Sequence, residues 1–296
     1  MQAPDTKKRP RMGDSAKAAV LMVFSMLLYA SENTIVKGLT GVLPLWQILM
    51  TTSGGGMLIF AVITKARGIP IFTPAMLSPT VLLRSIGEIL AAFGFILAMA
   101  FLPLTTFSAI LQAQPMIVTF GAVVFLRERI SWRRWLALIG GFCGVLLIVR
   151  PTTAAFDPYV LFALISAVGL ALRDLVSRQL VREIHTVQLS TWGLGTVLGS
   201  GLLLMPFGAP AQMPTPIMAL SLGLVFTISA LAYYAITAST RLAPASFVAP
   251  FRYTRLLFAL ALGGLVFGEV PDLPTLLGAG IIILSGLYTL SFGPQR

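Results

Sequence analysis

Charged residues are scarce in this sequence. Only 10% of its 296 residues are Asp, Glu, Lys or Arg, and 57% are hydrophobic, with a mean hydropathy of +0.91. A soluble domain carries about 25% charged residues, so this composition excludes a soluble globular domain and indicates a polytopic membrane protein.

Residue types that build catalytic and metal sites are scarce as well. The chain has one cysteine, Cys143, and one histidine, so it offers no disulfide framework and no histidine-based zinc motif. The sequence also lacks a nucleotide-binding glycine loop and clusters of acidic residues. We therefore expect no catalytic residues, no metal, no cofactor and no direct drive by ATP.

What the sequence does have is an excess of positive charge, +11 at neutral pH. In a soluble protein this excess would suggest nucleic acid, but here most Lys and Arg residues lie in the tails and in short segments between apolar runs, so they report membrane topology. We expect a lipid bilayer around the chain and no nucleic-acid partner. The apolar runs predict ten membrane-spanning helices, at residues 17–37, 45–64, 81–101, 105–126, 135–150, 159–177, 187–207, 217–239, 246–267 and 274–292.

The distribution of basic residues predicts the orientation in the membrane. Sixteen Lys and Arg residues fall on the side of the N-terminus, whereas only Lys37 and Arg150 fall on the other side. Cytosolic loops are the ones that carry an excess of Lys and Arg. We therefore expect both termini in the cytosol of a bacterium and the helices in its inner membrane.

The two halves of the chain resemble each other. A shift of 141 residues matches Ser25 with Ser166 and Glu128 with Glu269, and a shift of 140 aligns LPLTTFSA with LAPASFVA. Five helices per half is an odd number, so the second half must enter the membrane in the opposite orientation. Inverted repeats of this kind are typical of transporters.

The repeat predicts the domain organisation and an all-α membrane fold, with two inverted five-helix repeats around a central cavity. We expect a cytosolic tail over 1–16, the first repeat over 17–151, the second over 152–292 and a cytosolic end over 293–296.

Two blocks carry a resemblance to a known family. They are LPLTTFSAILQAQPMIVTFGAVVFLRERISWRRWLALIGGFCGVLLIVRP and its weaker copy LAPASFVAPFRYTRLLFALALGGLVFGEVPDLPTLLGAGIIILSGLY. With Glu128, Glu269, Trp135 and a shared glycine pattern, they resemble the drug/metabolite transporter superfamily, EamA type. The resemblance implies a basket of ten helices that exports small metabolites, most similar to bacterial amino-acid exporters. The sequence departs from many members at Gln47, where they carry an arginine.

Arg252 and Arg255 are the first candidates for a binding site. Both lie within an apolar span, where an arginine that faces lipid costs about 2.5–3.5 kcal/mol. Their spacing turns them about 60° apart on a helix, so both can face one cavity, and Pro250 permits a kink beside them. They would hold an anionic group, most simply a substrate carboxylate. Alternatively, Arg252 snorkels out to the cytosolic interface.

The acidic residues within the spans are Glu32, Glu88 and Asp174. Glu88 is spaced for an intrahelical ion pair with Arg84, and Asp174 for one with Arg178. Glu32 lies instead on a polar stripe of the first helix with Tyr29. A carboxylate there could hold a substrate ammonium group or carry a proton, and the two roles stay open.

Neutral polar and aromatic side chains complete the candidates. Ser108 and Gln112 follow one face of the fourth helix, and Tyr233 is an aromatic candidate in the eighth. Glu128 and Glu269 lie at loop edges, where we expect them to cap a helix or pair with an arginine. The candidate substrate-binding residues are Arg252, Arg255, Tyr253, Gln112, Ser108, Tyr29, Glu32, Glu88 and Tyr233.

Three function classes remain. The leading one is a secondary exporter of amino acids or similar small metabolites, in which one five-helix half rocks against the other around a small-molecule substrate. The second is a carrier for another anionic or nucleoside-like metabolite, including uptake. The third, an integral membrane enzyme, is disfavoured because no catalytic motif is present.

Overall fold

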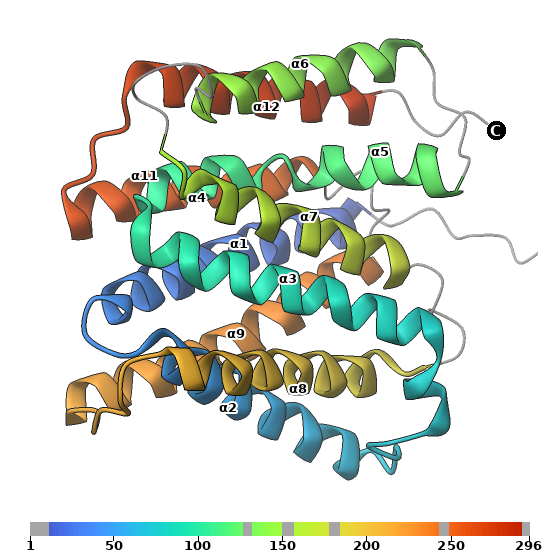
Figure 1. Ribbon diagram of the computed structural model, residues 1–296. Coiled ribbons are helices and arrows are strands. Elements are labelled where there is room, and N and C mark those ends of the chain that lie inside the picture. The colour runs from blue at the N-terminus through green and yellow to red at the C-terminus, as the bar shows by residue number, and fades with distance from the viewer. Residues whose placement is uncertain (1–11, 127–131, 150–156, 178–183, 243–248, 292–296) are drawn as a thin grey trace, which may run out of the picture.

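The computed structural model describes residues 12–126, 132–149, 157–177, 184–242 and 249–291 (Figure 1). Within these ranges the chain forms helices and no strands. The α-helices are α1 (Met12–Thr40), α2 (Leu45–Ala66), α3 (Pro79–Phe101), α4 (Leu104–Leu111), α5 (Gln114–Leu126), α6 (Trp132–Val149), α7 (Val160–Ser177), α8 (Thr186–Leu204), α9 (Pro216–Leu242), α11 (Thr254–Phe267) and α12 (Leu273–Ser291). The 3₁₀ helices are η1 (Pro74–Leu77), η2 (Met205–Phe207) and η3 (Ala249–Tyr253).

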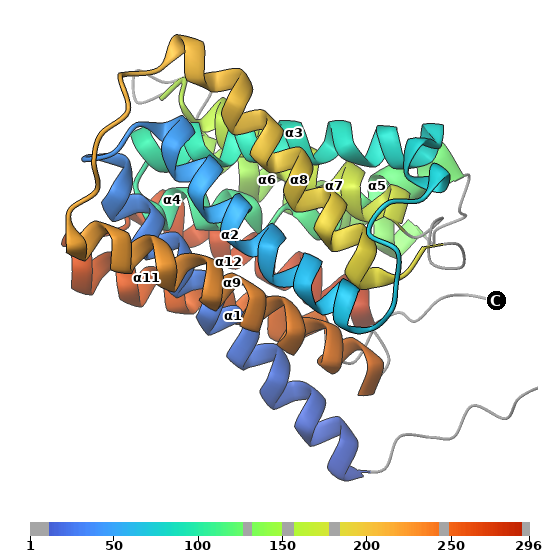
Figure 2. The ribbon, with the colours of Figure 1, turned by 90° about the horizontal axis from the view of Figure 1, so that it is seen from below.

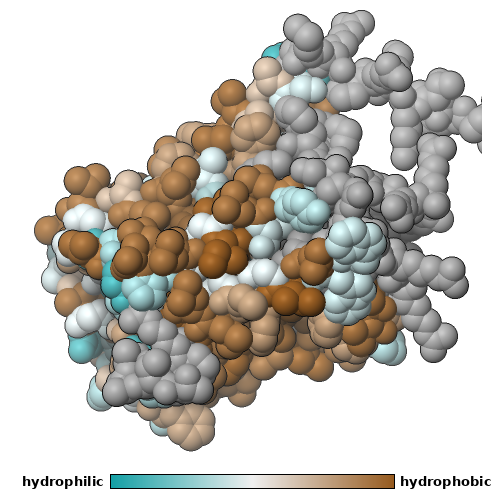
Figure 3. All heavy atoms as spheres, turned by 90° about the horizontal axis from the view of Figure 1, so that it is seen from above, coloured by the Kyte–Doolittle hydropathy of each residue, from teal (hydrophilic) through white to brown (hydrophobic). Residues whose placement is uncertain are grey.

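The helices form a membrane protein, as the sequence predicts. Seven segments in the described residues are long and apolar enough to cross a membrane, and two shorter apolar helices accompany them. The face shown in Figure 3 is mostly covered by apolar side chains. A soluble protein would not expose such a continuous apolar surface, whereas a lipid bilayer covers it at no cost.

Two of the ten predicted spans are broken near their middle. The fourth span divides into α4 and α5 around Gln112 and Ala113, and the ninth changes from η3 to α11 between Tyr253 and Thr254. Gln114, where α5 begins, and Thr254, where α11 begins, are 140 residues apart, which is the offset of the sequence repeat. Both breaks therefore belong to the repeated unit.

The two halves are interleaved. The four most extensive helix contacts include α3 with α7 and α1 with α9, and each of these pairs joins helices of different halves (Figures 1 and 2). We call α3, α4, α5 and α7 the first bundle, and α1, α9, η3 and α11 the second bundle. The pairs α2 with α8 and α6 with α12 pack beside them. From the sequence, one five-helix half is expected to move against the other. In the structure each half packs extensively against the other half, so the bundles, and not the halves, are the compact units.

The repeat is visible in matching hydrogen bonds. Ser25 of α1 donates to the carbonyl of Ala232 in α9 at 2.8 Å, and Ser166 of α7 donates to the carbonyl of Ala91 in α3 at 3.2 Å. Both donors and both acceptors are related by the offset of 141. Replacing each residue by its equivalent in the other half therefore converts the contacts of one bundle into those of the other.

The helices run between two ends of the molecule, left and right in Figure 1. We call them the Lys37 end, where α1, α3 and α11 finish, and the Arg84 end, near which α3 starts. Near the Lys37 end the space between the bundles is filled by apolar side chains that are at most 2% exposed, including Ile96, Met99, Leu102, Leu104 and Phe107.

Close packing of the first bundle depends on small residues. A Cβ atom on Gly94 of α3 would lie 2.5 Å from the Phe162 carbonyl oxygen and the Ser166 nitrogen of α7, whereas one on Gly199 of α8 would meet nothing within 4 Å. Backbone atoms cannot move aside without separating the helices, so a side chain at Gly94 must push α3 from α7.

We expect Gly94→Ala to destabilise the protein by about 1–3 kcal/mol, the usual cost of overpacking. Gly199→Ala is the matched control, and it should be neutral or stabilising because alanine favours a helix. Thermal unfolding of the two purified variants in the same detergent measures the difference. Equal melting temperatures would contradict the close-packing argument.

Candidate functional site

A cavity of about 630 Å³ lies between the bundles. It extends from the middle of the helices to the Arg84 end, where Ser177 at the end of α7 and Ile184 line it. Six of the predicted residues, Arg252, Arg255, Gln112, Glu32, Glu88 and Tyr29, line this cavity, and so does Tyr233. The cavity therefore gathers seven of the nine candidates, from α1, α3, α9, η3 and α11 and from the break between α4 and α5.

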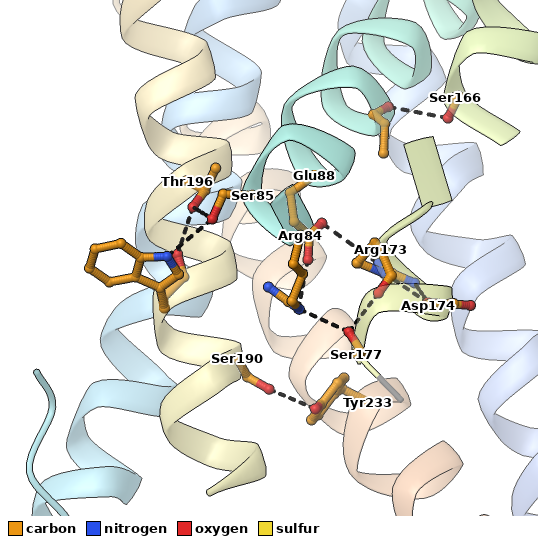
Figure 4. Close-up of polar contacts among 12 residues, drawn as sticks. Arg84, Ser85, Glu88, Ser166, Arg173, Asp174, Ser177, Ser190, Thr196 and Tyr233 are labelled. Carbon is orange, nitrogen blue, oxygen red and sulfur yellow. Dashed lines mark hydrogen bonds and ion pairs between the residues drawn. The ribbon is translucent and has the colours of Figure 1, made fainter. Parts of the chain in front are cut away.

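The first bundle lines the cavity with an ion-pair network (Figure 4). Arg84 donates from Nη2 to Oε1 of Glu88 at 2.9 Å and from Nε to Ser177 at 3.0 Å. This confirms the predicted pair between Arg84 and Glu88. On the other side of the same carboxylate, Nη1 of Arg173 lies 3.7 Å from Oε2 of Glu88.

Asp174 extends the network. It accepts hydrogen bonds from Nε and Nη2 of Arg173 at 3.0 and 2.9 Å, and from Nε2 of Gln114 at 2.8 Å. The predicted partner Arg178 lies outside the described residues. Two guanidinium groups and two carboxylates thus balance each other along this part of the cavity, and each carboxylate is held on both oxygens.

The second bundle lines the cavity with Glu32 from α1, Arg252 from η3 and Arg255 from α11. The guanidinium carbon of Arg255 lies 5.3 Å from the centre of the Tyr29 ring, a cation–π contact. Among the described residues, Oε2 of Glu32, Nε of Arg255 and Nε2 of Gln112 are buried and have no hydrogen-bond partner. These groups therefore have unused capacity to bind.

The charges of the cavity do not cancel. Arg84, Arg173, Arg252 and Arg255 give four positive charges, whereas Glu32, Glu88 and Asp174 give three negative ones, which leaves an excess of one positive charge. The network of the first bundle is neutral, so the excess lies with the second bundle. The structure shows no carboxylate in the described residues within ion-pair distance of Arg252.

The inverted repeat relates the two linings. The offset of 141 matches Glu32 with Arg173 and Glu88 with Ser229, which also lines the cavity. Arg173 was not among the residues predicted from the sequence, because the predicted partner of Asp174 lay one turn further along the helix. The signal was available, since the repeat places Arg173 at the position of Glu32, already a candidate.

Two candidates lie away from the cavity. Ser108 is 2% exposed and Tyr253 is 6% exposed, and neither lines the cavity. Tyr233 does line the cavity, where it accepts a hydrogen bond from Ser190 at 2.6 Å and contacts the ring of Phe60 edge-on. These two contacts fix the phenol in place.

A second pocket, of about 420 Å³, lies at the Lys37 end between the α1–α2 and α8–α9 connections. No charged side chain lines it. Gln47 exchanges two hydrogen bonds with the backbone of Gln212 beside this pocket, at 2.7 and 3.0 Å. Gln47 therefore holds a connection in place and does not reach the central cavity. Among the described residues, no three His, Cys, Asp or Glu side chains form a metal site.

Comparison with known families decides the class. The model of the EamA-like transporter family matches residues 16–150 and matches again at 157–291. The chain belongs to the EamA-like transporter family. The family thus accounts for both repeats, and the protein is a multi-pass membrane transporter, not an enzyme.

The related transporters are named for different substrates. The chain is 28% identical over 282 residues to a pseudopaline exporter of Pseudomonas aeruginosa, covering 94% of this chain and 97% of the relative. It is 26% identical over 189 residues to an S-adenosylmethionine uptake transporter of Rickettsia bellii, covering 64% of each. It is 31% identical over 191 residues to a riboflavin transporter of Vibrio cholerae, covering 64% of this chain and 63% of the relative.

A solved structure described only as a protein crystal structure has the same fold. Its TM-score is 0.63 at 17% identity, covering 92% of this chain and 96% of that one. Because the related transporters include both exporters and uptake systems, membership of the EamA-like family fixes transport but neither the substrate nor the direction.

The ion-pair network makes a testable contribution to stability. Glu88→Leu leaves Arg84 beside the cavity without its short ion pair, and breaking a buried pair on one side typically costs about 3–5 kcal/mol. The double variant Arg84→Met with Glu88→Leu removes both charges and should recover much of that loss. Melting temperatures of the single and double variants measure the coupling. If the loss of stability in the double variant equals the sum of the losses in the two single variants, the two residues are not coupled and the prediction is wrong.

Proposed function

We propose that this protein is a secondary transporter that exports amino acids or similar zwitterions across the inner membrane of a bacterium, with both termini in the cytosol. One observation carries the proposal. A carboxylate and two guanidinium groups line the same cavity from the second bundle, and two of these three groups have buried atoms without a partner.

A zwitterion complements this part of the cavity. Its carboxylate would bind Arg252 and Arg255, and its ammonium group would bind Glu32. Charge-assisted hydrogen bonds of this kind are about twice as strong as neutral ones, and they would satisfy the groups that have no partner. The first bundle offers less, because each of its two carboxylates is already held on both oxygens, and Nη1 of Arg84 is its one guanidinium nitrogen that is buried without a partner in the described residues.

Alternating access would then involve the two bundles. Each contains helices from both halves, and the inverted repeat relates one bundle to the other. A rocking motion between them would close the cavity at the Arg84 end and open it at the Lys37 end. The excess of basic loop residues at the Arg84 end supports a cytosolic position for that end.

A carrier for a nucleoside-like or other anionic metabolite is the second candidate. The names of the S-adenosylmethionine and riboflavin transporters support it, and so do the rings of Tyr29, Phe60 and Tyr233 in the cavity lining. Aromatic side chains stack on planar groups of such a ligand. This candidate includes uptake as the direction of transport.

Counterflow in proteoliposomes tests the proposal. We expect labelled amino acids to exchange saturably against unlabelled ones, and Arg255→Gln to raise the KM by about tenfold or more, because a hydrogen bond to a charged group contributes about 1.5–3 kcal/mol. Arg67→Gln, at an exposed position of the α2–α3 connection, is the control. Exchange of no amino acid by the active protein would favour the second candidate, and unchanged exchange by Arg255→Gln would remove Arg255 from the site.

Glu32 gives a separate prediction because it would meet only the ammonium group. Glu32→Gln should weaken competition by an amino acid by about tenfold while leaving competition by the matching 2-hydroxy acid unchanged, since that compound has no ammonium group. Competition against a labelled substrate measures both values. Equal losses for the two compounds would show that Glu32 does not contact the ammonium group.

A further inference from the structure

The two bundles are bridged at the Lys37 end by one carboxylate. Glu269 follows α11 directly, and its two oxygens accept hydrogen bonds from the backbone N–H groups of Leu104 and Thr105 at 2.7 and 2.9 Å. These groups belong to the first turn of α4, whose N–H groups have no partner within the helix. Glu269 thus caps a helix, as the sequence predicts, but the helix belongs to the other bundle.

Lys37, near the end of α1, strengthens the same bridge. Its Nζ lies 4.0 Å from Oε1 of Glu269 and donates to the carbonyl oxygen of Leu102, which lies between α3 and α4. The same ammonium group lies 5.7 Å from the centre of the Phe267 ring. Lys37 therefore joins the second bundle to the first one independently of the two backbone caps.

The backbone around Glu269 is shaped for this contact. Gly268 has a φ of +65°, which ends α11 and turns the chain, and the N–H of Glu269 bonds back to the carbonyl of Gly263 at 3.1 Å. A Cβ atom on Gly263 would lie 2.8 Å from the methyl group of Thr105 and 2.9 Å from Oε2 of Glu269. Glycine at this position lets α11 approach α4, beside which it lies in Figure 1.

The bridge and the cavity lie at different ends of the molecule, with the buried apolar side chains of the Lys37 end, such as Ile96 and Met99, beside the bridge. None of Lys37, Leu104, Thr105 and Glu269 lines the cavity, which reaches toward the Arg84 end instead. Opening the Lys37 end must separate the start of α4 from the ends of α1 and α11, so it must break these contacts. Closing it forms them again.

We propose that Glu269, supported by Lys37, is a gating residue of the transport cycle and holds the Lys37 end closed while the cavity is accessible from the Arg84 end. The inference rests on the proposed alternating access of the two bundles. Removing the charge of Glu269 weakens the caps and the ion pair together, and it shifts the population toward the state that is open at the Lys37 end.

Two cysteine reporters, each placed in a Cys143→Ser background, measure this shift. Ala109→Cys lies one turn beyond Thr105 on the same face of α4, at a fully buried position, and reports the Lys37 end. Leu189→Cys lines the cavity near the start of α8 and reports the Arg84 end. The measurement is the rate of maleimide labelling in nanodiscs, where both faces of the membrane are accessible.

We expect Glu269→Gln to speed the labelling of Ala109→Cys by about fivefold or more, in the range typical of coupled conformational equilibria, and to slow that of Leu189→Cys. Lys37→Met leaves both backbone caps in place, so it should change the rates in the same directions by a smaller factor. Lys37→Met also tests the proposal if Glu269→Gln does not fold. Asp272→Asn is the matched control, because Asp272 caps the next helix through the N–H of Thr275 at 3.1 Å.

The two rates separate gating from a purely structural role. Faster labelling of both reporters would show that the variant merely loosens the protein, and rates equal to those of Asp272→Asn would show that Glu269 holds nothing closed; either result overturns the proposal. Neither reporter needs a substrate. The gating proposal can therefore be wrong even if the protein exchanges amino acids, and it can be right even if the protein carries another metabolite.

Discussion

A charged side chain inside a hydrocarbon layer needs a counter-charge, water or a ligand, because its desolvation is otherwise too costly. The centre of this protein is organised by that constraint. Arg84, Arg173, Glu88 and Asp174 form ion pairs with each other along the first bundle, whereas Glu32, Arg252 and Arg255 form no such network and face the cavity. The helices that carry these residues must surround a polar space, so the largest apolar cluster extends to the other end of the molecule and only two small ones lie toward the Arg84 end.

The inverted repeat gives the two bundles the same framework but different chemistry. The serine-to-carbonyl bonds of α1 with α9 and of α7 with α3 are equivalent, and the breaks at α5 and α11 fall at equivalent residues. The charges do not follow this equivalence, since Glu32 stands where the other half has Arg173. A shared framework allows the two bundles to exchange conformations, and unequal side chains let one of them provide the specific binding groups.

Much of this could be predicted from the sequence, because hydrophobicity and periodicity are local properties. They gave the spans, the repeat, the pair of Arg84 with Glu88 and seven candidate residues that line the cavity. The interleaving of the halves could not be predicted, because it depends on contacts between helices far apart in the chain. Ser108 and Tyr253 do not line the cavity, and the helix geometry gives a physical reason: Tyr253 ends a 3₁₀ helix and Ser108 precedes a break, so the faces of a straight α-helix do not apply.

The interleaving also has a consequence for synthesis in the cell. Ser25 finds its acceptor in Ala232, which the ribosome adds 207 residues later, and the same holds for the packing of α1 against α9. Helix α1, with Glu32 on its polar stripe, therefore enters the membrane well before its own partners exist. Until the second half is inserted, the carboxylate of Glu32 must be solvated by the translocon, by the membrane–water interface or by another helix. The two bundles can therefore assemble only after both halves are in the membrane, and the halves do not fold independently.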